Sequence, residues 1–210
     1  LAAICNSTGN VMAMMPHPER AIEGDVIFSS MKEYIEKENP VSNDTLTYNS
    51  SKQKLINFTP NPKASYWKIS ALITDNTAST VQQTLQNLNC NVNINRQVFW
   101  EIETDSNKNQ ILKKIDESGE LYNSNKEYID KNTEHNYDLS LLVLQKDDVN
   151  ARMKYESLSN RFKIGGINKI TRGVVWNISL NGGNIQDVLE QIINTNILYN
   201  QESHECYRIN

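Results

Sequence analysis

Short apolar runs alternate with turn-rich and amphipathic stretches along the first part of this chain. Residues 1–5 and 11–15 are apolar and are separated by Asn, Ser, Thr and Gly, which predicts a hairpin of buried strands. Apolar residues then recur at helical spacing over 27–35, which predicts a helix of roughly 12 residues with Asp25 as its N-cap. The N-terminal part is therefore expected to be a hairpin followed by a helix.

Residues 39–65 have a different pattern. They are rich in Asn, Ser, Thr and Pro and have little periodicity, which is typical of a linker. One apolar run interrupts this stretch at 55–58, and we expect it to dock on a neighbouring surface.

The remaining residues contain an internal repeat. Residues 96–102 match 172–178, with Arg, Val, Trp and Ile each displaced by 76 positions (172 minus 96). Upstream, 68–73 match 138–143 at a displacement of 70, and downstream 121–123 match 198–200 at 77. The differing offsets indicate loops of different length around shared elements, as expected of two diverged copies.

Each copy is predicted to run strand, helix, strand, strand, helix, strand, which is the split βαβ or ferredoxin-like order. The periodicity places strands at 67–74, 98–103 and 126–129 and helices at 79–88 and 110–115 in the first copy, and strands at 137–144, 174–180 and 205–209 and helices at 149–161 and 185–193 in the second.

The predicted fold class is therefore α+β, with two tandem ferredoxin-like βαββαβ units packed as a pseudo-dimer behind the hairpin and helix. The expected segments are 1–38, a linker at 39–65, a first repeat at 66–131 and a second at 136–210. Such units pack sheet to sheet or edge to edge. Trp100 and Trp176 hold equivalent positions in the two copies, and they either fill the junction or pack under their own helices. Arg96 and Arg172 are also equivalent, and they are either solvated strand-end residues or contacts for a partner or phosphate.

Composition excludes several classes of function. The net charge is −4 and no run of Lys and Arg exceeds two residues, which argues against a nucleic-acid or anionic-membrane surface. No apolar run approaches the ~18 residues of a membrane span. The three cysteines have neither metal-site nor disulfide-framework spacing, so a reducing, cytoplasmic location is expected.

The stretch Pro16-His17-Pro18-Glu19 carries the candidate chemistry. The prolines bias Met15 and His17 toward extended backbone, in which His17 and Glu19 face the same side. A carboxylate beside an imidazole fixes its tautomer and stabilises the imidazolium, which is the orienting role in a catalytic triad. On spacing alone, an ordinary surface histidine in a proline-rich strand exit is the alternative.

The sequence GNVMAMMPHPERA at 9–21 resembles the C-terminal signature of class I glutamine amidotransferases, and 2–21 is especially similar to the glutaminase subunit of phosphoribosylformylglycinamidine synthases. The resemblance implies catalytic roles for His17 as general base and Glu19 as its orienting carboxylate. The family's nucleophile lies in a Gly-x-Cys-Asn-Gly turn that this chain lacks, so we expect a chain that begins inside a larger protein and is inactive alone. Cys5 is expected to be a buried strand residue.

The second copy is similar to the small subunit of the same synthase family. The resemblance lies in ITRGVVWNISL at 170–180 and in NTNILYNQESHECYRI at 194–209, although the family's lysine after Arg172-Gly173 is absent. It implies a component of a glutamine-dependent, ATP-driven C–N ligase of purine biosynthesis, which amidates formylglycinamide ribonucleotide. The repeats would bridge the glutaminase domain and the large synthetase subunit for ammonia transfer.

The same resemblance implies the ligands and partners. The chain is expected to bind no cofactor or metal itself, with ATP and Mg held by the synthetase partner and glutamine bound by the complete glutaminase domain. The alternative from another class is a tandem ferredoxin-like regulatory module that binds a small metabolite such as an amino acid. The motif around His17 and Glu19 favours the synthase, because a sensor module has no need of it.

Overall fold

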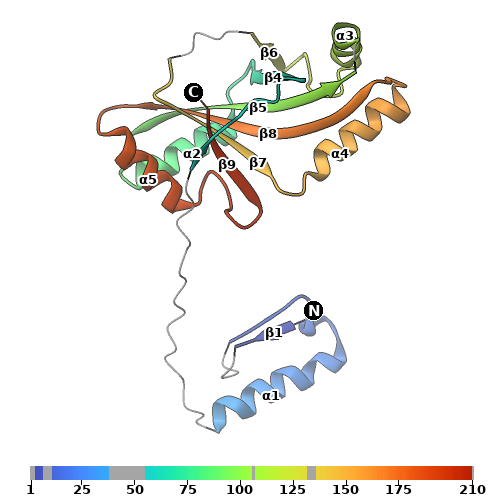
Figure 1. The fold of residues 1–210 in the computed structure, drawn as a ribbon. Helices are drawn as coiled ribbons and strands as arrows, with labels where there is room; N and C mark the ends of the chain where they lie inside the picture. Colours follow the sequence, from blue (N-terminus) through green and yellow to red (C-terminus); the bar gives the residue numbers. More distant parts are fainter. Residues whose placement is uncertain (1–2, 7–10, 38–54, 106, 132–135, 210) are drawn as a thin grey trace. The chain divides into compact units, whose positions relative to one another are not determined.

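The computed structural model describes residues 3–6, 11–37, 55–105, 107–131 and 136–209. The chain divides into two compact units, residues 1–51 and 52–210. Helices and strands occur in both units (Figure 1), which confirms the predicted α+β class. Among the described residues, no helix is both long and apolar enough to cross a bilayer.

The first unit is a hairpin followed by a helix. Strands β1 (Ala3–Cys5) and β2 (Met12–Met14) pair antiparallel, and helix α1 (Asp25–Glu36) follows. The predicted hairpin and helix are therefore confirmed. The predicted cap is wrong, because Gly24 holds the N-cap position and Asp25 is the first helical residue.

The strands of the first unit were expected to be buried, and this expectation is wrong. Ile4 is 60% exposed, and Gly24 is the one buried residue among the described part of this unit. Two short strands and one helix offer too little apolar surface to cover one another, because a hairpin needs a further layer against its face.

The second unit is built on a seven-stranded sheet with strand order β3-β9-β7-β8-β5-β4-β6. The strands are β3 (Ile56–Asn57), β4 (Ala64–Ala71), β5 (Val92–Thr104), β6 (Glu127–Asp130), β7 (Leu139–Gln145), β8 (Ile167–Leu180) and β9 (His204–Ile209). The short β3 pairs parallel with β9, and the other neighbouring strands of this sheet pair antiparallel. Residues 55–58 thus dock on the sheet edge, as predicted.

Each copy of the repeat runs strand, helix, strand, helix, strand. Its helices are α2 (Asn76–Asn87) and α3 (Lys108–Ser118) in the first copy, and α4 (Val149–Glu156), continued by a π-helical turn (Ser157–Arg161), and α5 (Ile185–Thr195) in the second. The two middle strands expected in each copy are one continuous strand, of 13 residues in β5 and 14 in β8. Side chains alternate between the two faces of the sheet along β5 and β8, and no proline interrupts either strand.

The two copies join edge to edge through β5 and β8, which run side by side through the sheet (Figure 1). Val98 lies opposite Val174 at the centre of this ladder. The register also corrects the alignment of the first strands: Trp67 lies opposite Trp100 and Leu141 opposite Trp176, so β4 and β7 correspond at a displacement of 74 (141 minus 67) instead of 70.

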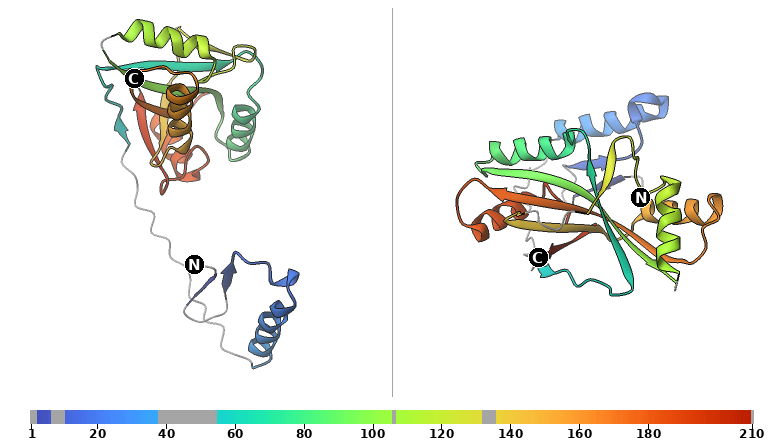
Figure 2. Two further views of the ribbon diagram at one scale, coloured as in Figure 1. Left: turned by 90° about the vertical axis from the view of Figure 1, so that its right-hand side faces the viewer. Right: turned by 90° about the horizontal axis from the view of Figure 1, so that it is seen from above.

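The apolar core forms three clusters, and the two larger ones lie near opposite ends of the long strands, where the helices also lie (Figure 2). Trp176 packs with Leu85 from the first copy and with residues of α5, whereas Trp100 packs with residues of α3 and with Leu158 from the second copy. Each tryptophan therefore shares a core cluster with a helix of its own copy and with a residue of the other copy, so the two expected placements occur together. A third cluster, formed around Phe99, receives Phe58, whose ring lies edge-on at 5.9 Å.

Candidate functional site

His17 and Glu19 are in direct contact. The Nδ1 atom of His17 lies 2.9 Å from Oε1 of Glu19, and their side chains are 62% and 55% exposed. The backbone that brings them together is not the predicted extended segment. Residues Pro18–Arg20 form a single 3-10 turn with His17 as its N-cap, because the fixed φ of proline suits the first position of a helix.

The turn is held by three backbone hydrogen bonds. The N–H groups of Arg20 and Ala21 donate to the carbonyls of His17 and Pro18, at 3.1 and 3.2 Å, and Gly24 N–H donates to Ala21 at 3.0 Å. A Cβ atom at Gly24 would lie 1.9 Å from the Pro18 carbonyl oxygen. Only glycine therefore permits this close approach between the turn and the start of α1.

The contact gives the imidazole a defined orientation. A carboxylate at Nδ1 holds the proton there, so Nε2 is left as the acceptor of a general base. Arg20 Nε lies 3.7 Å from the same Glu19 oxygen. Cys5, expected to be buried, is exposed in β1 opposite Met12. The pair is thus suited to take a proton from a nucleophile on another segment.

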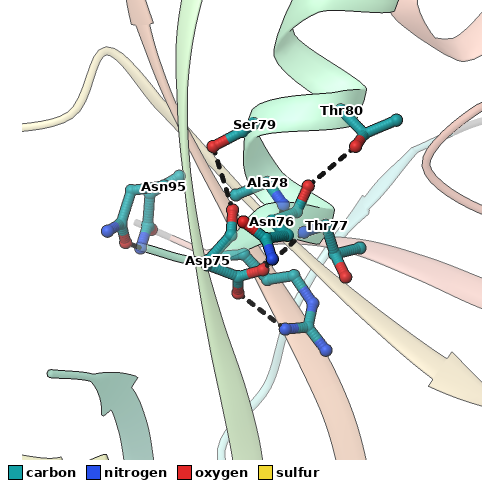
Figure 3. A network of polar contacts seen from close by, with 9 residues as sticks. Asp75, Asn76, Thr77, Ala78, Ser79, Thr80 and Asn95 are labelled. Carbon is teal, nitrogen blue, oxygen red and sulfur yellow. Dashed lines mark hydrogen bonds and ion pairs between the residues drawn. The ribbon is translucent and has the colours of Figure 1, made fainter. Parts of the chain in front are cut away.

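A second polar site lies at the start of α2. One oxygen of Asp75 accepts hydrogen bonds from the N–H groups of Thr77 and Ala78, at 2.9 and 3.1 Å, and the other accepts from Arg96 Nη1 at 2.7 Å. Figure 3 shows Asp75 at the helix end beside the hydroxyls of the first turn. Arg96 is therefore in a largely buried ion pair and is not a solvated strand end, which was one of the two expectations for it.

Burial raises the pKa of Asp75, but the hydrogen bonds from Arg96 and from the amides of Ala78 and Thr77 outweigh it, so the net pKa is lowered. The equivalent residue of the second copy is Asp148, which caps α4 by accepting from Ala151 N–H at 2.9 Å. The sequence signal for both caps is an aspartate directly before a helix.

A buried polar network crosses the middle of the sheet. The Nε2 atom of Gln97 donates to Ser70 Oγ and to Asp130, at 2.9 and 2.8 Å. Asn177 donates to Gln97 Oε1 at 3.0 Å, and Ser140 donates to Asn177 at 2.7 Å. The network forms part of the wall of an open groove of about 840 Å³. Sequence reasoning singled out none of these residues.

The described residues show no group of three or more His, Cys, Asp and Glu side chains placed to hold a metal ion. His204 lies in β9 near Ser203 Oγ and the Asn200 carbonyl, and His135 lies outside the described residues. No protein-family model matches the chain.

Proposed function

We propose that this chain is a component of a phosphoribosylformylglycinamidine synthase, the glutamine-dependent ligase of purine biosynthesis. The first unit supplies the histidine and the glutamate of a glutaminase triad, and the second unit bridges the glutaminase domain and the synthetase subunit. The contact of 2.9 Å between His17 Nδ1 and Glu19 Oε1 carries the proposal, because a glutaminase needs an oriented base.

The strand order of the second unit supports the bridging role. Apart from the short β3, the order β6-β4-β5-β8-β7-β9 has the two copies on either side of the β5–β8 ladder. We infer that the copies are tandem ferredoxin-like units, which replace in one chain the homodimer of the family's small subunit. Pairing of β5 with β8 covers the sheet edge that each copy would otherwise expose, and the outer surfaces of the pair remain for the two enzymes.

In this proposal His17 does the proton transfer. Its Nε2 takes the thiol proton of the glutaminase cysteine as the sulfur attacks the side-chain carboxamide carbon of glutamine. The same proton then passes to the departing nitrogen, which leaves as ammonia while the acyl group stays on sulfur. Water, deprotonated by Nε2, releases glutamate. Glu19 stabilises the imidazolium at each step.

Ammonia must then reach the synthetase, which would hold ATP and Mg and use ATP to convert formylglycinamide ribonucleotide to its amidine. The repeats contribute by fixing the relative position of the two enzymes, so that ammonia moves between sites at high effective concentration. This role requires no catalytic side chain in the second unit.

The experiment is co-purification of the chain with the large synthetase subunit of its own organism. A stable complex is expected, with loss of the complex when residues 52–210 are removed.

The groove beside Gln97 favours a second candidate, a metabolite-binding module. A rise in melting temperature with an amino acid, in a chain that binds no synthetase, would support that candidate instead.

A further inference from the structure

Arg96 and Arg172 hold the same position in the two copies, but their guanidinium groups have different surroundings. Arg96 Nη1 lies 2.7 Å from Asp75 Oδ2, and both side chains are largely buried, 22% and 19% exposed. The matching aspartate of the second copy, Asp148, makes no such bond. Its Oδ2 accepts the backbone N–H of Arg172 at 3.0 Å, and its Oδ1 accepts Ala151 N–H.

The guanidinium of Arg172 has no carboxylate partner among the described residues. It lies over the ring of Trp100, 5.9 Å from the ring centroid, in a half-buried position. A guanidinium carries five N–H donors, and stacking on an aromatic ring uses none of them. A partly desolvated cation of this kind is a strong site for an acceptor with two oxygens.

Arg172 borders a pocket of about 410 Å³, which is within the usual size range of small-molecule sites. Lys154, Asn150 and Tyr122 also line it, above the buried ring of Trp100.

Two carboxylates line the same pocket, and both are engaged. Glu120 Oε1 pairs with Lys154 Nζ at 2.9 Å, and Glu127 accepts the Asn123 N–H at 2.8 Å. Neither makes a hydrogen bond or ion pair with Arg172 among the described residues. The pocket therefore retains one arginine whose donors are available to a ligand.

We propose that this pocket binds a small organic carboxylate through Arg172. The ligand's carboxylate would pair with the guanidinium of Arg172, as the Asp75 carboxylate pairs with that of Arg96 in the first copy. Lys154 and Asn150 then contact the remainder of the ligand. The proposal is independent of the roles given to His17 and Glu19.

The test is a calorimetric titration of the chain with succinate, L-glutamate and L-aspartate, with succinamide and inorganic phosphate as comparison ligands. At least one carboxylate is expected to bind, succinamide is not, and Arg172→Gln is expected to weaken binding about tenfold or more. The matched control is Arg152→Gln, which changes an exposed arginine of α4 that pairs with Asp147, and this variant should bind as the wild type does.

A second variant covers a failure of Arg172→Gln to fold. Asn150→Asp supplies an internal carboxylate at the pocket wall and should abolish binding while keeping or raising the melting temperature. Absence of binding by every carboxylate at millimolar concentration would overturn the proposal, as would binding of phosphate alone or equal binding by Arg172→Gln.

Discussion

Val98 lies directly opposite Val174 in the ladder between β5 and β8, and these valines are the same residue of the two copies. An antiparallel ladder that pairs a residue with its own equivalent has a local two-fold axis at that pair. Arg96 accordingly lies opposite Trp176, and Arg172 opposite Trp100. The register therefore pairs matching positions of the repeat about the centre of the β5–β8 ladder.

Close packing between β7 and β8 predicts the effect of a single methyl group at Gly173. A Cβ there would lie 2.6 Å from Leu144 Cδ2 and 2.9 Å from the Val143 carbonyl oxygen. Gly173→Ala should therefore lower the free energy of unfolding by about 1–3 kcal/mol, measured by urea denaturation. Gly165→Ala is the control, because nothing lies within 4 Å of its Cβ position. Equal stability of the two variants would contradict the packing described.

The ion pair of Asp75 predicts a specific pH dependence. Because the folded pKa of Asp75 is lowered, the stabilisation is complete above the ordinary aspartate pKa of about 3.9 and is lost as the pH falls toward the folded value. Asp75→Asn keeps a good helix cap but removes the charge facing Arg96, at a cost of roughly 1–2 kcal/mol near neutral pH.

The measurement for that ion pair is denaturant unfolding of wild type and variant between pH 3 and pH 7. The difference between them should shrink as the pH falls. The matched control is Asp148→Asn, which changes a helix cap that has no guanidinium partner. A larger loss for Asp148→Asn than for Asp75→Asn would contradict the assignment.

The buried amides predict non-additive mutations. Gln97 and Asn177 are each 2% exposed. Gln97→Ala removes the acceptor that lies 3.0 Å from Asn177 Nδ2, which keeps Asn95 Oδ1 at 3.2 Å, and the loss of this buried hydrogen bond should cost about 1–3 kcal/mol. The double variant Gln97→Leu with Asn177→Leu removes both polar groups and should lose less than the sum of the single Leu variants. Additive losses in a double-mutant cycle of unfolding free energies would argue against a shared network.

The three cysteines should differ in reactivity. Burial raises the pKa of Cys206 to about 12 and also raises the pKa of Cys90, so both remain protonated thiols at neutral pH. Cys5 is exposed. Iodoacetamide should therefore label Cys5 in the native chain and the other two only after unfolding, as read by mass spectrometry. Native labelling of Cys206 at the rate of Cys5 would contradict the described burial.

Periodicity and the repeat were enough to predict the α+β class, the helices and the hairpin, because these depend on local spacing. They were not enough to predict the full length of β5, since its Asn-rich first half has the composition of a loop while its alternation is that of a strand. The network around Gln97 also escaped prediction. Its partners come from several strands, and only the register brings them together.

At the candidate site, too, local spacing predicted one feature and missed those that depend on residues further along the chain. The Pro-His-Pro-Glu spacing predicted that the imidazole and the carboxylate would meet, and they do. It did not predict the 3-10 turn, which depends on Gly24 further along the chain. The partners of Arg96 and Arg172 were not predictable. Each depends on which donors the two carboxylate oxygens of an aspartate at a helix start accept, and the sequence does not show this.

We propose that His17 serves as the base of a glutaminase. The most direct measurement compares glutamine-dependent with ammonia-dependent amidation by the assembled complex that contains this chain, with His17→Asn against wild type. The glutamine-dependent rate should fall by about 10²–10⁴-fold while the ammonia-dependent rate is unchanged, and Arg20→Gln should leave both near wild type. A His17→Asn complex that uses glutamine as well as the wild type does would contradict the account.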